Sequence, residues 1–171
     1  MARYRMGLAK EDFKFSSAHF TLFGDGRAEL LHGHNYRVRV ELSGNDLDGE
    51  GLLVDIESFK RTLRGLCARL DSRTLVPGES RRLACSREGA SVVVRCGERS
   101  YHFPAEDTLV LPLANTSIEL LARMFWRDLA PSLEDSRVEV LAVSVEETAG
   151  QQCWYEEGLE VLGLEVLDPG L

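Results

Sequence analysis

Apolar side chains alternate with polar ones along four stretches of the chain, and this period of two predicts four β-strands. The clearest stretch reads YRVRVEL, in which a tyrosine, two valines and a leucine share one face while two arginines and a glutamate share the other. A loop with two glycines, FGDGRAE, separates it from the strand before. The four predicted strands cover residues 10–23, 36–42, 136–148 and 151–167.

Two other stretches repeat apolar residues every three or four positions, which is the spacing of one helix face. The first helix begins after Asp55, a residue type that caps helix N-termini, and its apolar face runs to Leu70. The second helix covers residues 115–129, where Thr116 and Glu119 have the spacing of a capping box.

The segment between the two helices predicts less regular structure. It contains an irregular piece through Pro77 and Gly78, a β-hairpin over residues 90–103 that turns near Gly97, and a short extended run over residues 107–113. The predicted order is therefore strand, strand, helix, hairpin, helix, strand, strand. A length of 171 residues is that of one domain, and we expect a single domain over residues 1–171.

Charge and composition narrow the classes of partner. The chain carries 28 acidic and 20 basic residues, a net charge of -8, and no run of basic residues, which argues against binding to nucleic acid or to an anionic membrane. No stretch reaches the ~20 apolar residues of a membrane span, and the N-terminus lacks the apolar core of a signal peptide. The four cysteines show no C-x-x-C pairing, so we expect free thiols in a cytoplasmic protein.

Three of the four histidines suggest a metal site. His32 and His34 are two residues apart in a predicted strand, so both imidazoles point to the same face. His19 ends the preceding strand, and antiparallel pairing of the two strands brings it close to the pair. Three imidazoles with a fourth position open are the composition of a catalytic zinc site. The alternative is three ordinary surface or core histidines, and residue chemistry alone leaves both readings open.

Several polar residues are candidates for the chemistry beside such a metal. Glu29 lies three residues before the histidine pair, where a carboxylate can act as general base for a proton that the metal has acidified. Asp71 ends the first helix, where an acidic residue opposes the helix dipole. Glu147 ends a valine-rich strand and could accept two N–H donors from a heterocycle. Thr116 and Ser117 could contact a ligand, although capping alone explains Thr116. The alternatives without a function are a solvated loop residue for Glu29, a turn residue for Asp71 and an exposed strand end for Glu147.

Six stretches together resemble the 6-pyruvoyl tetrahydropterin synthase family, which includes the 6-carboxytetrahydropterin synthases. They follow the family's order and read FSSAHF, LHGHNYRVRVEL, GLLVDIESFK, LDSRTL, NTSIELLARMFW and VSVEET. The resemblance implies an α+β tunnelling fold, with an antiparallel four-stranded sheet and two helices on one face, and here an inserted β-hairpin at about residues 80–107. It also implies trimers that stack as a homohexamer, with active sites between subunits.

The resemblance assigns roles to individual residues. It implies three ligands of Zn²⁺, an anchor for the pyrimidine edge of a pterin, and two further pterin contacts. These are, in that order, His19, His32 and His34, then Glu147, then Thr116 and Ser117.

Two departures from the family pattern bear on the reaction. The usual catalytic cysteine is replaced by Ala28, and the histidine of the usual Asp-His pair after the first helix is replaced by Ser72. A cysteine–aspartate–histidine relay is therefore absent. What the chain has instead is E-x-x-H-G-H, led by Glu29, which resembles the type III subfamily. That resemblance implies a lyase that cleaves the side chain of 7,8-dihydroneopterin triphosphate to give 6-hydroxymethyl-7,8-dihydropterin for folate biosynthesis.

In this interpretation Glu29 is the catalytic base, and Asp71 orients a water or a proton carrier. The triphosphate requires cations, for which Lys14, Arg27 and Arg73 are candidates by position. Two alternatives stay open: a 6-pyruvoyl- or 6-carboxy-tetrahydropterin synthase whose catalytic groups have moved, and a non-catalytic pterin-binding homologue.

Overall fold

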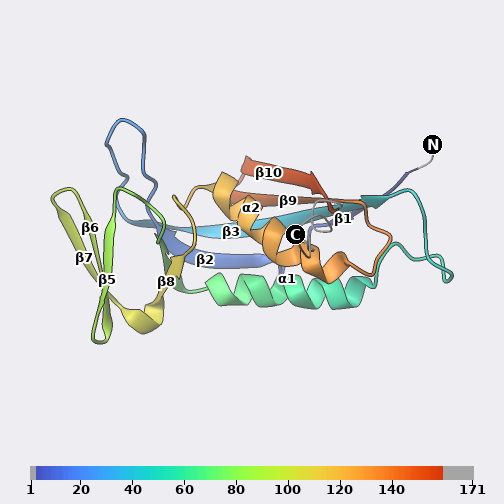
Figure 1. The fold of residues 1–171 in the computed structure, drawn as a ribbon, viewed down its shortest axis with the longest axis horizontal. Coiled ribbons are helices and arrows are strands. Elements are labelled where there is room, and N and C mark those ends of the chain that lie inside the picture. Colours follow the sequence, from blue (N-terminus) through green and yellow to red (C-terminus); the bar gives the residue numbers. More distant parts are fainter. Residues whose placement is uncertain (1–2, 160–171) are drawn as a thin grey trace, which may run out of the picture.

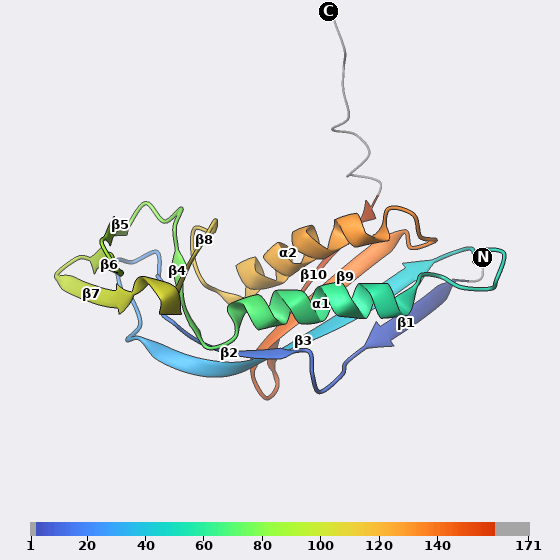
Figure 2. The same cartoon turned by 90° about the horizontal axis from the view of Figure 1, so that it is seen from below.

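One large curved sheet carries both helices on the same side, as Figures 1 and 2 show. The computed structural model describes residues 3–159. The strands of the large sheet follow the order β10-β9-β3-β2-β4-β8, and β1 pairs with β3 as well. The elements of this layer are β1 (Tyr4–Leu8), β2 (Lys14–His19), β3 (His32–Gly44), α1 (Ile56–Leu70), β4 (Arg73–Pro77), β8 (Thr108–Leu111), α2 (Ile118–Leu129), β9 (Val140–Thr148) and β10 (Gln151–Gly158), and a short 3₁₀ helix, η2 (Ala130–Leu133), follows α2.

The long strand β3 organises the sheet. Its first half pairs antiparallel with β2, its second half pairs with β1 along the same edge, and β9 runs antiparallel along its other edge. The side chains that face the helices are those expected from the alternating pattern, and Tyr36, Val38, Val40 and Leu42 are all buried. Phe15 of β2 stacks on Tyr36 with ring centroids 4.7 Å apart and lies 5.8 Å from Phe125 of α2, so sheet and helices share one core.

Within residues 3–159 the sheet has seven strands, and the prediction of four was wrong in that respect. The four predicted strands lie side by side in it as β2, β3, β9 and β10. Strands β4 and β8 continue it in parallel. Because Leu75, Val76 and Pro77 of β4 are all buried, this strand shows no alternation that could reveal it. The predicted first strand is shorter than expected, since the chain leaves the sheet after His19. The end of the last predicted strand, beyond residue 159, lies outside the described residues.

Helix α1 begins as predicted, because the Asp55 carboxylate accepts hydrogen bonds from the amides of Glu57 and Ser58. Helix α2 does not begin as predicted. Its N-cap is Ser117, which makes no capping bond through its side chain, and the capping box expected at Thr116 does not form. The reason is that the Thr116 hydroxyl donates instead to the carbonyl of Phe20, at 3.0 Å.

The segment predicted as a hairpin forms a small three-stranded sheet. Strands β6 (Ser91–Cys96) and β7 (Arg99–Pro104) do form a hairpin at Gly97, where φ is +58°, but β5 (Ala84–Glu88) pairs with β6 as well. The 3₁₀ helix η1 (Ala105–Asp107) leads from it to β8. This second sheet stands at one end of the large sheet (Figure 1) and has its own core, built from Phe20, Val76, Val92 and Val94.

The cysteines form no disulfides, and the four thiols are free. Cys67 lies in the main core on α1, where burial raises the pKa of its thiol to about 12, so it stays protonated. None of the helices within residues 3–159 combines the length and the apolar composition needed to cross a bilayer.

Replacing Phe125 by alanine should lower the free energy of unfolding by about 3–5 kcal/mol, because the ring is 1% exposed and its loss leaves a cavity between α2 and the sheet. The control is Leu52→Ala at a side chain that is 52% exposed, which should change stability by about 0.5 kcal/mol or less. Urea unfolding measures both. Equal effects of the two variants would contradict the position of this core.

Candidate functional site

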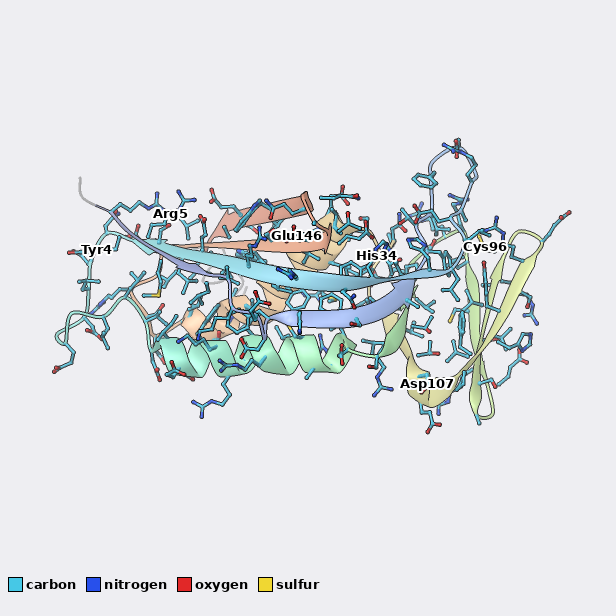
Figure 3. The ribbon with its side chains drawn as sticks, turned by 180° about the vertical axis from the view of Figure 1, so that it is seen from behind. Tyr4, Arg5, His34, Cys96, Asp107 and Glu146 are labelled. Carbon is cyan, nitrogen blue, oxygen red and sulfur yellow. The ribbon has the colours of Figure 1, made fainter. Side chains whose placement is uncertain are left out.

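Strand pairing gathers three histidines and a glutamate at one end of the sheet. His19 on β2 is the direct cross-strand partner of His32 on β3, and His34 follows on the same face. Glu147 comes from β9, the next strand over. Their ligand atoms all lie within 4.8 Å of one another, which is the arrangement of a metal site. The cluster faces the helix side of the sheet, near the end of β3 at which Figure 3 labels His34.

Backbone carbonyls fix the orientation of two of the imidazole rings. His19 donates through Nδ1 to the carbonyl of Thr116, at 2.9 Å, and His32 donates through Nδ1 to the carbonyl of Leu30, at 2.7 Å. A carbonyl can only accept, so each ring carries its proton on Nδ1. The lone pair of each Nε2 is therefore free for a metal, which is the usual state of a metal-binding histidine.

The Nε2 atoms of His19 and His34 are buried and have no hydrogen-bond partner among residues 3–159. Glu147 Oε1 lies 3.0 and 3.4 Å from them, but without the alignment of a hydrogen bond. Burial lowers the pKa of His19, and the two neighbouring histidines act in the same direction, so this ring is neutral at neutral pH. Neutral imidazoles with buried, unpartnered nitrogens are the groups that a divalent metal ion requires, and the four residues fit one.

Glu147 is the member of the cluster whose position the sequence did not indicate. The structure places its carboxylate against two of the histidines, and its expected contact with a ligand stays a prediction. Tyr36 donates to Oε1 at 3.4 Å and Gln151 donates to Oε2 at 3.0 Å. Burial and the charge of Glu147 raise the pKa of Tyr36 well above its ordinary value, so Tyr36 remains a neutral donor. The missing signal was the pairing of β9 with β3, which joins residues distant in sequence.

Glu29 lies beside the cluster without belonging to it. Its Oε2 accepts from the Thr21 amide at 2.9 Å, and its own amide donates to the Thr21 carbonyl at 3.0 Å. Partial burial raises the pKa of this carboxyl, but the hydrogen bonds from Thr21 and the nearby His32 and His19 outweigh burial and lower it. Glu29 is therefore ionised at neutral pH, as a general base must be.

The other predicted residues occupy supporting positions. Asp71 is exposed at the end of α1, where its Oδ1 accepts from the Ser16 amide at 2.7 Å and so ties the helix to β2. It is not among the four clustered residues. Thr116 is fully buried, and its carbonyl and hydroxyl hold His19 and Phe20. Catalytic or substrate contacts of Asp71, Thr116 and Ser117 stay predictions.

The three candidate phosphate-binding cations do not lie together in one cavity. Arg27 pairs with Asp25 at 2.6 Å and lines an open groove of about 880 Å³ together with Glu29. Arg73 lines a different cavity, on which His34 also borders. Lys14 lies on β2 opposite Arg37 and lines neither of them.

Sequence reasoning missed two residues near the site. Asn115 holds Leu22 through both its backbone groups, with Oδ1 accepting from the amide at 3.1 Å and Nδ2 donating to the carbonyl at 2.9 Å. Cys96 lines the same groove as Ala28 and Glu29. Neither carries a local signal, because Asn115 reaches the site by binding the distant Leu22 and Cys96 reaches it through the packing of the second sheet.

Comparison with known proteins gives consistent matches over nearly the whole chain. The family described as 6-pyruvoyl tetrahydropterin synthase matches residues 8–158. A relative from Haemophilus influenzae, named 6-carboxy-5,6,7,8-tetrahydropterin synthase, is 23% identical over 86% of this chain and 96% of its own length. A relative from Methanocaldococcus jannaschii that carries the same name provisionally is 29% identical over 86% of this chain and 92% of its own.

Solved structures agree with the fold. The crystal structure of 6-pyruvoyl tetrahydropterin synthase from Plasmodium vivax matches with a TM-score of 0.86 and 27% identity, over 92% of this chain and 99% of that one. Two further structures of the P. vivax protein are titled as mutants of a catalytic residue, in which a glutamate is replaced by alanine or by cysteine.

Removing one imidazole should remove the metal. We expect the purified protein to contain a divalent metal ion, and His34→Ala to lower metal affinity by about tenfold or more, because one lone pair of the set is lost. His102→Ala on β7, outside the cluster, should keep the metal and serves as the control. Metal content after dialysis against a weak chelator measures both. A wild-type protein without metal, or equal metal in the two variants, would refute the site.

Proposed function

The chain belongs to the 6-pyruvoyl tetrahydropterin synthase family, and from this premise we propose that it is a zinc-dependent lyase that acts on 7,8-dihydroneopterin triphosphate. The names of its relatives support a 6-pyruvoyl- or 6-carboxy-tetrahydropterin product. They favour that product over 6-hydroxymethyl-7,8-dihydropterin, which the sequence interpretation placed first. The observation that carries the proposal is the ionised Glu29 beside three convergent imidazoles.

Zinc is the metal that best suits this donor set. Three imidazole nitrogens with an open position are typical of catalytic zinc, and the two carbonyl-bound Nδ1 atoms leave Nε2 as the donor atoms of His19 and His32. When bound, zinc would supply Lewis-acid chemistry and lower the pKa of the hydroxyls on the substrate side chain. All other groups that the reaction requires have to come from the protein.

Glu29 is the residue proposed to move the proton. Formation of a 6-pyruvoyl product converts two side-chain hydroxyls into carbonyl groups: the dihydropterin ring takes up one electron pair and becomes a tetrahydropterin, and expulsion of triphosphate balances the second carbonyl. A base must therefore remove a proton from the side-chain carbon next to the ring. Glu29 is ionised, and Thr21 holds one of its oxygens in place while the other stays available. The catalytic glutamate named in the P. vivax variants supports this role.

Glu147 is proposed to hold the pterin ring. Its carboxylate is half-buried, lies next to two metal ligands, and keeps its position through Tyr36 and Gln151. A carboxylate in that place can accept two N–H groups from the guanidine-like edge of a pterin and so fix the side chain against the metal. Thr116, whose carbonyl binds His19, and the adjacent Ser117 are proposed as further pterin contacts, and Asp71 would act from the end of α1.

A second candidate reaction is favoured by one specific observation. Ala28 and Ser72 replace the cysteine and histidine that the resemblance associates with the synthases. A lone carboxylate can take the proton of the second side-chain hydroxyl, after which the bond between the two hydroxyl-bearing carbons breaks. The pterin ring takes up the electron pair, the second carbon leaves as an aldehyde that carries the triphosphate, and reprotonation gives 6-hydroxymethyl-7,8-dihydropterin. The first candidate requires that Glu29 replaces this cysteine as the base that removes the carbon proton, and Cys96 lines the same groove as Glu29.

The assembly belongs to the proposal as well. We expect a homo-oligomer, with a homohexamer and sites between subunits as its specific form. In support, β10 lies at an edge of the large sheet and Trp154 on it is 40% exposed. Among residues 3–159 no strand pairs with the outer edge of β10, and such an edge with an exposed indole is suited to pairing with a second copy of the chain.

Product analysis tests the proposed function. The zinc-loaded protein, incubated with 7,8-dihydroneopterin triphosphate, should yield a 6-pyruvoyl- or 6-carboxy-tetrahydropterin, identified by mass spectrometry. In Glu29→Gln, kcat should fall by about 10²–10⁴-fold with zinc retained, because the amide cannot accept the proton. Glu98→Gln, an exposed acid of the same groove, is the control.

Each outcome of the product analysis is informative. Formation of 6-hydroxymethyl-7,8-dihydropterin alone would select the second reaction. If the wild-type protein binds the pterin without converting it, both proposed reactions are wrong, and the protein is a non-catalytic pterin-binding homologue. Full activity of Glu29→Gln would remove Glu29 from the mechanism.

The variant Glu147→Gln distinguishes between two roles of Glu147, an anchor for the pterin ring and a ligand of the metal. As an anchor, its loss should raise KM by about 10- to 100-fold with zinc content unchanged, because one charged hydrogen-bond acceptor is lost. Glu156→Gln, an exposed acid on β10, should change neither quantity. If the glutamine variant loses zinc instead, Glu147 is a metal ligand and not the anchor.

A further inference from the structure

Two arginines of the second sheet region reach the loop that carries Glu29. Arg82, which precedes β5, donates through Nη1 to the carbonyl of Phe23. Its Nη2 donates to the carbonyls of Gly26, at 2.6 Å, and Arg27, at 3.1 Å. One guanidinium group therefore donates hydrogen bonds to three carbonyls at the tip of the loop. These bonds form only when the loop has this conformation, so they stabilise it.

Arg99 holds the next part of the same loop. It stands at the start of β7, and its Nη1 donates to the carbonyls of Ala28, at 3.2 Å, and Glu29, at 2.8 Å. Figure 3 labels Cys96, which ends the neighbouring strand β6 and lines the same groove. The contact is to the backbone of Glu29, so it leaves the carboxylate free while fixing the point from which the side chain extends.

Together with one metal-site contact, these bonds engage five consecutive carbonyls. Those of residues 26–29 accept from the two arginines, and the carbonyl of Leu30 accepts from His32 Nδ1. The other bonds of the loop include a single β-bridge between Leu22 and Ala28, a few backbone bonds, and side-chain bonds between Asn115 and Leu22 and between Asp25 and Arg27. Its path is therefore set largely by the second sheet, and that path places both Glu29 and the ring of His32.

The same sheet also holds the first arm of the loop. Phe20 and Leu22 pack into its core, and Phe20 stacks on Tyr101 with ring centroids 5.5 Å apart. Thr21 lies between them, and its amide binds the Glu29 carboxylate. The second sheet therefore positions both the backbone of Glu29 and the Thr21 amide that orients its carboxylate.

We propose that the second sheet is a positioning device for Glu29, and that Arg82 and Arg99 are positioning residues. Its catalytic part rests on the proposed function. The competing role for exposed arginines beside a groove is to bind the anionic tail of a substrate. The geometry favours positioning, because both Nη atoms of Arg82 and the Nη1 of Arg99 already donate to carbonyls of the loop, five carbonyls in all.

Hydrogen exchange tests whether Arg82 and Arg99 hold the loop, and this experiment does not depend on turnover. In Arg82→Ala and Arg99→Ala, amides of residues 20–31 should exchange about tenfold faster or more than in the wild type, because the loop opens more often. The informative amides are those of Phe23 and Glu29, which bond to the carbonyls of Arg27 and Thr21. Arg87→Ala on β5, an exposed arginine of the same sheet, is the matched control and should leave this exchange unchanged. Unchanged exchange in all three variants would overturn the proposal.

Steady-state kinetics tests the catalytic part. In Arg99→Ala, kcat should fall by about 10- to 100-fold with KM within about twofold, and zinc content and Tm should stay at the wild-type values. Arg99→Lys should recover part of kcat, because an ammonium group can still donate to both carbonyls. A higher KM with unchanged kcat would show instead that the arginine binds substrate. If the wild-type protein turns over no pterin, the proposed function fails, while the exchange experiment still decides whether the arginines hold the loop.

Discussion

The register of β2 against β3 is the constraint on which the site depends. His19 faces His32 across the strands, and four residues earlier Phe15 faces Tyr36 in the same register. A slip by one residue would turn every side chain of β2 to the other face and expose Phe13 and Phe15. Each buried aromatic contributes about 1.5–3 kcal/mol, so the core strongly opposes such a slip. The same strand register therefore buries the two phenylalanines and aligns the histidines.

Carbonyl groups from two distant parts of the chain then prepare the imidazoles. Thr116 lies just before α2 and orients His19, while Leu30 lies in the loop before β3 and orients His32. The start of α2 is fixed in turn by Thr116 and Asn115, which bind the backbone of Phe20 and Leu22. The tautomers that suit a metal are therefore a consequence of how α2 and the second sheet pack on the end of β2.

The local parts of this arrangement could be predicted from sequence, whereas the long-range parts could not. The H-x-H pair on one strand face, the third histidine across a short connection and the Asp55 cap depend on near neighbours. Glu147 joins the cluster through a strand pairing that brings it to Tyr36, 111 residues away in sequence. Gly33, between the two histidines of β3, is not required for lack of space, because a Cβ there would meet only the Ser17 carbonyl, at an ordinary 3.5 Å.

The loss of two residues from the family pattern has a single physical explanation in the proposed function. A thiol has an ordinary pKa near ~8.5 and needs a base or a cation to be ionised at neutral pH, which is the role of an Asp-His pair. Glu29 needs no such partner, because the hydrogen bonds from Thr21 lower its pKa and it is already ionised. Once a carboxylate supplies the base, the cysteine replaced by Ala28 and the histidine replaced by Ser72 lose their function together. The bond that breaks then depends on which proton the carboxylate can reach, and that reach is determined by the loop that Arg82 and Arg99 hold.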